Sequence, residues 1–183
     1  MYMSDTNRQF DEALAMCRDI FEKKLSDYGA SWRIMRPAAL TDQLFIKAKR
    51  IRSLELKGHS VVGEGILPEF IGIVNYGVIG IIQLEHGFAD SKDINAETAL
   101  AWYDEVIARI KKLMIAKNHD YDEAWRMMRV LSYTDLILTK IQRTKEIEDH
   151  CGATCISEGI DANYMDMVNY AVFGIIKLTD GQE

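Results

Sequence analysis

The sequence contains few of the residues that interrupt helices or cross-link chains. Only two of its 183 residues are proline and only three are cysteine. The scarcity of proline, together with many strong helix formers, predicts long helices joined by short loops. Three unevenly spaced cysteines do not make a disulfide framework, so we expect a reducing compartment, the cytoplasm.

The common signatures of several enzyme classes are also missing. The sequence has no G-x-x-x-x-G-K-[ST] loop, no G-x-G-x-x-G turn and no G-x-S-x-G elbow, so P-loop, Rossmann and serine-hydrolase chemistry have no support. The first residues, "MYMSDTNRQF", show no basic segment followed by an apolar one, and no secretory signal is expected. His150, Cys151 and Cys155 lack a second pair of ligands at zinc spacing, so no zinc site is predicted.

The charge balance and the longest apolar run limit the partners. A net charge of −6 argues against nucleic acid polymers, although a local cluster of Lys and Arg can still hold one nucleotide. The run "FIGIVNYGVIGIIQL" is shorter than the roughly 20 residues that a membrane span needs, and it contains Asn75. We therefore expect a buried core helix there and no membrane partner.

Most of the chain is a tandem duplication. Three segments return 93 or 94 residues later: "DYGASWRIMR" (27–36) as "DYDEAWRMMR" (120–129), "TDQLFIKAKRIRSLE" (41–55) as "TDLILTKIQRTKEIE" (134–148), and "EGILPEFIGIVNYGVIGIIQL" (64–84) as "EGIDANYMDMVNYAVFGIIKL" (158–178). Two copies are too few for a solenoid, so the duplication predicts an all-α helical bundle in which two repeats are related by a pseudo-two-fold axis. We divide the chain into a first repeat (1–86), a linker with the start of the second repeat (87–102) and a second repeat (103–183), packed as one unit.

Each repeat is predicted to contain three long helices and one short helical piece. The first helix spans about 7–26, its counterpart starts after Asn95 as N-cap, and the short piece ends before Pro37. The third helix is expected to start at Thr41 or Thr134 as a candidate cap. The fourth, about 67–85 in the first repeat, is apolar nearly all round and is therefore enclosed by its neighbours. Matching glycines, Gly80 and Gly174, predict that the two fourth helices cross near the pseudo-two-fold axis.

Polar residues on the fourth helices are the first functional candidates. A buried amide without a partner costs about 1–3 kcal/mol, so Asn75 and Asn169 need partners. Asp166 precedes Asn169 by three residues, which puts both side chains on one helix face and predicts a Mg²⁺ site. The first repeat has Gly72 in place of Asp166, unless Glu69 compensates. The alternative is that the two asparagines fix helix packing by bonding each other or a nearby backbone group.

The third helices supply candidate phosphate ligands. Lys and Arg three residues apart share a helix face and can grip phosphate oxygens; the pairs are Lys47 with Arg50 and Lys140 with Arg143. The alternative is a solvated face with ordinary ion pairs within the helix.

Three further acids are candidates for the site. Asp27 and Asp120 end the first helices and are expected to cap the next short helix or to act as substrate ligands. Glu158 lies just before a fourth helix, where an acid favours the helix N-terminus, or it completes a catalytic site with Asp166 and Asn169.

The repeated motifs also resemble a known family. At "DYGASW", "KAKRIRSLE" and "EFIGIVNYGVIGIIQL", and at their second copies, the chain resembles the nucleotide modification associated domain 1 family. The resemblance implies site residues at Asp27, Tyr28, Gly29, Lys47, Arg50, Asn75 and Tyr76, and at Asp120, Tyr121, Lys140, Arg143, Asp166, Asn169 and Tyr170. Gly72 and Asp122 depart from the family pattern. More remotely, the chain is similar to MazG-like all-α nucleoside triphosphate pyrophosphohydrolases, but it lacks their Glu-Glu-x-x-Glu helix.

These observations favour a protein that handles a small-molecule nucleotide. The first hypothesis is a Mg²⁺-dependent nucleotide (pyro)phosphohydrolase, in which Asp166 and Asn169 hold the metal and Lys140 and Arg143 hold phosphates. The alternatives are a nucleotide-binding or sensing module without turnover, and a structural helical interaction protein in which Asn75 and Asn169 are joined by hydrogen bonds. Homo-oligomerisation stays open, because a duplicated chain can already be equivalent to a dimer.

Overall fold

The structure is a computed structural model that describes all residues except 1, 61–62, 156–157 and 181–183. The described residues form six α-helices, two 3-10 helices and no strand. In chain order these are α1 (Tyr2–Tyr28), η1 (Ser31–Ile34), α2 (Pro37–Lys57), α3 (Leu67–His86), α4 (Ala96–Tyr121), η2 (Ala124–Met127), α5 (Val130–Asp149) and α6 (Ile160–Thr179). The predicted all-α class and the plan of each repeat are confirmed.

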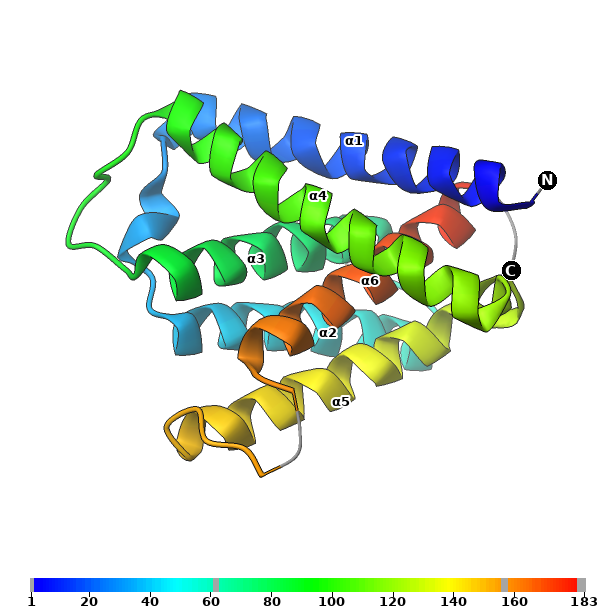
Figure 1. The fold of residues 1–183 in the computed structure, drawn as a ribbon. Helices are drawn as coiled ribbons and strands as arrows, with labels where there is room; N and C mark the ends of the chain where they lie inside the picture. The colour runs from blue at the N-terminus through cyan, green and yellow to red at the C-terminus, as the bar shows by residue number, and fades with distance from the viewer. Residues whose placement is uncertain (1, 61–62, 156–157, 181–183) are drawn as a thin grey trace.

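The helices form three layers, and each layer takes one helix from each repeat (Figure 1). α1 and α4 form one outer layer, α2 and α5 the other, and α3 and α6 lie between them. A helix in the middle layer has neighbours on both sides, so it needs an apolar surface nearly all round. This position explains why the fourth helix of each repeat is the most apolar segment of its copy.

The middle layer shows the pseudo-two-fold relation. A Cβ atom added to Gly80 would lie 2.8 Å from the ring of Tyr164, and one added to Gly174 would lie 3.0 Å from the ring of Phe70. Phe70 and Tyr164 are themselves equivalent positions of the two repeats. Each glycine thus receives the ring of the other repeat, and the predicted close crossing of the fourth helices is confirmed.

The outer layer of α2 and α5 repeats this reciprocity. Thr41 Oγ1 donates to Glu148 at 2.6 Å, and the equivalent Thr134 Oγ1 donates to Glu55 at 2.8 Å. The prediction that these threonines cap their helices is wrong. α2 begins four residues earlier at Pro37, whose fixed φ suits the first helical turn, and α5 begins at Val130. The threonines lie inside the helices, where their hydroxyls join the two repeats.

The N-cap predicted for the second repeat is confirmed. The side chain of Asn95 accepts a hydrogen bond from the backbone N–H of Thr98 at 2.8 Å. The preceding segment, 87–95, is a loop whose described residues are mostly exposed. It joins the two repeats as the linker prediction required.

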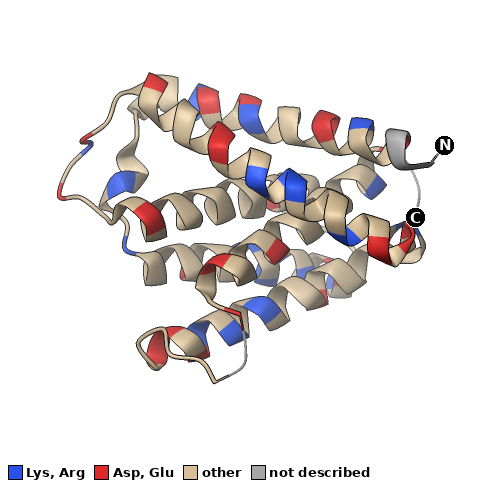
Figure 2. Ribbon diagram, viewed as in Figure 1, with Lys and Arg blue, Asp and Glu red and all other residues tan. Residues whose placement is uncertain are grey.

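Helix α3 is the one candidate membrane span that the described part of the chain contains. Its 20 residues are long and apolar enough by composition, so the argument from run length alone was wrong. However, 67% of its most apolar window is buried inside the bundle, as in a core helix. Figure 2 agrees with this assignment, since acidic and basic residues are interspersed along α1 and α4, whereas α3 carries few.

Candidate functional site

Each repeat contains a pocket at an equivalent place, beside its fourth helix and the turn that follows its first helix. The second-repeat pocket has a volume of about 340 Å³, and its main lining residues are Lys117, Asn118, Trp125, Asp166, Asn169 and Tyr170. The first-repeat pocket has about 640 Å³ and contains Lys24, Leu25, Trp32, Gly72, Asn75 and Tyr76 at those same positions. Both volumes fall within the roughly 300–1,000 Å³ typical of small-molecule sites.

Asp166 is the charged centre of the second-repeat pocket. Its two carboxylate oxygens accept from Lys117 Nζ at 2.6 Å and Lys140 Nζ at 2.7 Å. Burial alone raises the pKa of Asp166, but the hydrogen bonds and charges of the two lysines outweigh burial, and the net shift is downward. For Lys117, burial lowers the pKa, but the bond to Asp166 outweighs burial and the net shift is upward. Asp166 and Lys117 are therefore both held in their ionised forms, and Asp166 contacts two lysine side chains.

Asn169 lies one helical turn after Asp166 on the same face, as predicted, and lines the same pocket. It is only 5% exposed, and neither its Oδ1 nor its Nδ2 has a hydrogen-bond partner among the described residues. An amide buried in this way costs about 1–3 kcal/mol. Hydrogen bonding within the described residues therefore does not explain the amide of Asn169.

In the first repeat, both the Nδ2 and the Oδ1 of the equivalent residue, Asn75, have hydrogen-bond partners. Its Nδ2 donates to the backbone oxygen of Cys17 at 3.0 Å, and its Oδ1 accepts from Tyr103 Oη at 2.7 Å. The predicted bond between Asn75 and Asn169 is therefore wrong, while the alternative of a bond to nearby backbone is confirmed for Asn75. The equivalent of Tyr103 in the other repeat is Phe10, which has no hydroxyl to give to Asn169.

In the first repeat, the two basic side chains of α2 form ion pairs with Glu69. It is 5% exposed, and it binds Arg50 Nη1 at 2.6 Å and Lys47 Nζ at 3.3 Å. Gly72 stands where the second repeat has Asp166, and a Cβ there would lie 3.3 Å from Lys47 Cε. The stem of Lys47 therefore passes over Gly72 to reach the acid one turn earlier, so Glu69 compensates in charge but not in position.

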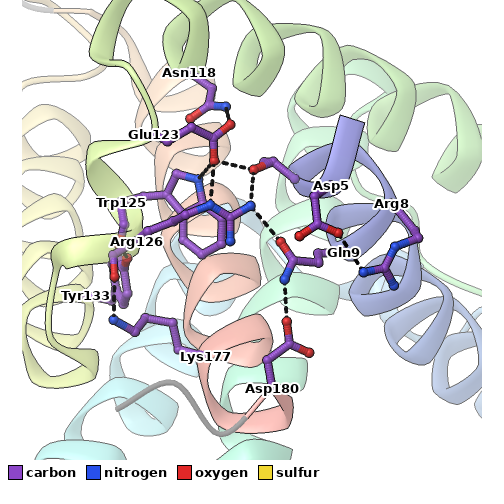
Figure 3. Close-up of polar contacts among 11 residues, drawn as sticks. Asp5, Arg8, Gln9, Asn118, Glu123, Trp125, Arg126, Tyr133, Lys177 and Asp180 are labelled. Atoms are coloured by element: carbon purple, nitrogen blue, oxygen red, sulfur yellow. Dashed lines mark hydrogen bonds and ion pairs between the residues drawn. The ribbon is translucent and has the colours of Figure 1, made fainter. Parts of the chain in front are cut away.

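Glu123 is not among the residues that line the second-repeat pocket, but it hydrogen-bonds two that are, Asn118 and Trp125 (Figure 3). Its carboxylate accepts from Asn118 Nδ2 at 2.5 Å, Arg126 Nε at 2.7 Å and Trp125 Nε1 at 3.2 Å, and also from Thr6 Oγ1. Burial alone raises the pKa of Glu123, but these hydrogen bonds outweigh burial and the net shift is downward. Two wall residues, Asn118 and Trp125, are thus oriented by one carboxylate.

The turn that carries Glu123 is strained in the second repeat. Asp122 and Glu123 both have left-handed backbones, with φ of 47° and 60°. In the first repeat the equivalent of Asp122 is Gly29, with φ of 67°, a conformation that costs glycine little. The four hydrogen bonds of Glu123 offset this strain at a position where the first repeat has a glycine.

A long polar residue from each fourth helix holds the adjacent 3-10 helix. Lys177, 4% exposed, donates to the backbone oxygens of Arg126 at 3.0 Å and of Met128 (Figure 3). Its equivalent, Gln83, donates to the backbone oxygens of Trp32 at 3.2 Å, Arg33 at 2.9 Å and Met35 at 2.8 Å. These contacts fix the tryptophan beside each pocket. Trp32 and Trp125 are both buried, as the core prediction for Trp expected.

The remaining candidates of α5 lie in a separate hollow. Lys140, Arg143 and Glu158 line an outer pocket of about 530 Å³ together with Glu146 and Asn163. Lys140 therefore faces Asp166 as predicted, whereas Arg143 is exposed and forms no ion pair among the described residues. Glu158 is exposed in this outer pocket and does not share the second-repeat pocket with Asn169.

Asp27 and Asp120 are not brought into either repeat pocket. Both are exposed, and Asp120 lies beside His119 at 3.2 Å. The prediction that they cap the short helices is wrong, because the N-cap positions are Ala30 and Glu123. The helical direction after Tyr28 and Tyr121 changes through left-handed turn residues and not through an acidic cap.

The predicted Mg²⁺ ligands do not form a set that fits the ion. Mg²⁺ favours several oxygen ligands in a near-octahedral arrangement, but both oxygens of Asp166 bind ammonium groups. In the described part of the chain, no three His, Cys, Asp or Glu side chains are grouped to hold a metal. We therefore derive no chemical step through a metal.

Several site residues escaped the sequence analysis. Lys117 and its equivalent Lys24 stand one turn before the repeated "DY" pair, so the duplication itself could have singled them out. The difference between Phe10 and Tyr103 was visible in the aligned segments "FDEAL" and "YDEVI". The structural consequence of this difference was not visible in the sequence, because only the fold shows that Tyr103 hydrogen-bonds the asparagine of the other repeat.

Comparison with known proteins supports the duplication. The model of a family described as nucleotide modification associated domain 1 matches residues 24–84 and 117–178. The two matches cover equivalent parts of the two repeats, and together more than half of the chain. Searches among curated proteins and solved structures find no match.

Proposed function

Because the chain belongs to the nucleotide modification associated domain 1 family, we propose that it binds a nucleotide in its repeat pockets. The observation that carries the proposal is the pairing of lysines with aromatic walls in both copies. Lys24 and Lys47 line the first-repeat pocket and Lys117 lines the second. Lys140 reaches Asp166 from the outer pocket. An aromatic face can stack on a base, and an ammonium group can bind phosphate oxygens.

The second-repeat pocket has the parts that such a ligand needs. Trp125, Tyr170 and Phe173 provide aromatic surface, with Trp125 and Phe173 stacked at 4.6 Å between ring centroids. Lys117 lines the same pocket with 44% of its side chain exposed. Since Asp166 neutralises one of two lysines, one positive charge is left for a phosphate.

The two alternatives have less support from the geometry. Hydrolysis with Mg²⁺ needs a metal ligand set, and the paired oxygens of Asp166 do not supply one. A purely structural role accounts for the hydrogen bonds of Asn75, but not for the unpartnered amide of Asn169. Binding without turnover is therefore the function that the site supports best.

Thermal shift tests the proposal directly. Nucleoside monophosphates and triphosphates at millimolar concentration should raise Tm, because a ligand that binds only the folded state stabilises it. The double variant Lys24→Met, Lys117→Met should lose most of the shift, since a charge-assisted hydrogen bond contributes about tenfold or more in affinity. The two single variants then show which repeat binds. No shift with any nucleotide, or an unchanged shift in the double variant, contradicts the proposal.

The same samples separate binding from hydrolysis. Release of phosphate or pyrophosphate is followed with and without Mg²⁺, and we expect none. A product that forms only with Mg²⁺ and is lost in Asp166→Asn would favour the hydrolase instead.

A further inference from the structure

We propose that Asn169 recognises the hydrogen-bonding edge of the nucleobase, and that of the two repeat pockets only the second can do so. This inference rests on the proposed nucleotide binding and adds the group that the pocket selects. It is carried by a difference between two equivalent asparagines, one satisfied inside the protein and one free.

The free amide is a built feature of the second-repeat pocket. Asn169 is 95% buried on α6, lines the pocket, and has neither a donor nor an acceptor for its amide among the described residues. Its neighbour Asp166 is fully occupied by two lysines and offers it nothing. Since buried polar groups in native proteins nearly always have partners, the partner of Asn169 is expected from outside the chain.

The chemistry of an amide defines that partner. Asn presents an N–H donor and a carbonyl acceptor side by side, and it pairs in a bidentate way with an edge that presents an acceptor beside a donor. Each of the common nucleobases has such an edge. The aromatic walls formed by Trp125 and Tyr170 suit the flat ring of a base, and Lys117 suits its phosphate. The ligand class is therefore a base-containing nucleotide, and a sugar phosphate alone lacks the recognised group.

Access to the amide requires a small movement. Both amide atoms are closed to solvent, so a pocket side chain has to rotate before a base edge reaches them. Lys117, which is 44% exposed in its side chain, has the freedom to do this. Its ammonium group is bound to Asp166 at 2.6 Å, a bond for which a phosphate can compete.

The first repeat cannot offer the same recognition. There Tyr103 Oη and the backbone oxygen of Cys17 occupy both ends of the Asn75 amide. In the second repeat the position of Tyr103 is taken by Phe10, whose ring lies 5.9 Å from that of Phe173, one turn after Asn169 on α6. The missing hydroxyl leaves Asn169 Oδ1 without the donor that Asn75 has, and Asn169 Nδ2 also has no partner among the described residues.

The decisive variant restores that hydroxyl. Phe10→Tyr should give Asn169 Oδ1 an internal donor, as Tyr103 gives one to Asn75 Oδ1, without changing any charged residue of the pocket. Affinities for AMP, GMP, CMP, UMP and ribose 5-phosphate are measured by titration calorimetry on the full chain. The monophosphate that binds wild type best should bind Phe10→Tyr about 10-fold more weakly, since the base loses its hydrogen bond to Asn169 Oδ1. Ribose 5-phosphate should bind both proteins equally and more weakly than that monophosphate.

A second variant keeps the test valid if Phe10→Tyr folds poorly. Asn169→Leu keeps the branched skeleton of the side chain without its polar atoms and should show the same selective loss. Asn75→Leu is a poor control because it breaks existing bonds. Phe88→Tyr adds the same hydroxyl at an exposed position outside both repeat pockets, so it serves as the matched control and should leave the base preference unchanged.

The possible failures are distinct. If a nucleoside monophosphate binds, but Phe10→Tyr and Asn169→Leu keep the wild-type affinity, the inference fails and the proposed function stands. The same holds if ribose 5-phosphate binds as tightly as the monophosphates. If none of the monophosphates binds wild type, both the inference and the proposed function are wrong.

Discussion

The two repeats differ most in how they treat the same asparagine. Asn75 holds α3 against α1 and α4 through two hydrogen bonds, whereas Asn169 has no partner in the described residues. The hydroxyl that is present on Tyr103 and absent from Phe10 accounts for the free Oδ1 of Asn169. The comparison shows how a duplicated fold can free a packing residue from its internal partners without changing its place on the helix.

The positions that the repeats keep and those that they change have different structural roles. Residues at the pseudo-two-fold axis, such as Gly80 and Thr41, contact the opposite copy, so their equivalents must fit together reciprocally. Asp166 and Gly72 line the pockets and contact lysine side chains of their own repeat. Asp166 and Gly72 can therefore differ without disturbing the crossing of α3 and α6.

The largest expected effect on stability concerns the two equivalent asparagines. Asn75→Leu should lower the free energy of unfolding by about 2–3 kcal/mol, because Tyr103 loses its hydrogen-bond partner in the core. Asn169→Leu should leave stability unchanged or raise it by about 1 kcal/mol, because it removes an unsatisfied amide. Chemical denaturation of both variants measures the difference, and equal losses would show that Asn169 has a structural partner too.

Asp166 gives the next largest effect, and the effect depends on pH. Asp166→Asn should cost about 2 kcal/mol at pH 7, because Lys117 and Lys140 lose a shared, buried carboxylate. The pKa of Asp166 is lowered in the folded state, so its stabilisation is present above the unfolded pKa near 3.8 and is lost as pH falls through the lower folded value. The stabilities of variant and wild type, measured by denaturation, should therefore converge as pH falls below 3.8 and through the lower folded pKa, and a constant gap across that range would contradict this origin.

The glycines of the middle layer test the helix crossing. Gly80→Ala should cost about 1–2 kcal/mol, since the added methyl group meets the ring of Tyr164 and the strain exceeds the gain in helix propensity. Gly174→Ala, against Phe70, should cost slightly less. Gly72→Ala on α3 is the control, because its neighbour is the flexible stem of Lys47; it should be neutral or stabilising. Equal effects at Gly72 and Gly80 would argue against the close crossing.

The smallest effect concerns the turn after α4. Asp122→Gly should stabilise the protein by about 0.5–1 kcal/mol, because glycine adopts the left-handed backbone at φ 47° with little strain. The reverse change in the first repeat, Gly29→Asp, should destabilise by a similar amount. Thermal melts of the two variants give the comparison, and a destabilised Asp122→Gly would mean that the aspartate side chain itself holds the turn.

The sequence was sufficient for the fold because the duplication and the helix periodicity agree. It predicted the helices, the Asn95 cap and the crossing at Gly80 and Gly174. It misplaced the starts of α2 and α5, since a threonine before an apolar stripe looks like a cap, and only the packing of the repeats shows Thr41 bonding Glu148.

The site was less predictable for a physical reason. Helix spacing placed Asp166 and Asn169 on one face correctly, but partners from other helices decide what a charged group does. Lys117 on α4 completes the pairing of Asp166 and removes it from the expected metal chemistry. Asp27 and Asp120 stay outside because their helices present them to solvent, which the motif alone does not reveal.

A crystal structure of the full chain soaked with the monophosphate that binds best would test the central difference between the repeats most directly. The account predicts ligand density in the second-repeat pocket, with the base edge within hydrogen-bond distance of Asn169 and a phosphate oxygen near Lys117. Ligand density only in the first-repeat pocket, or a base turned away from Asn169, would contradict it.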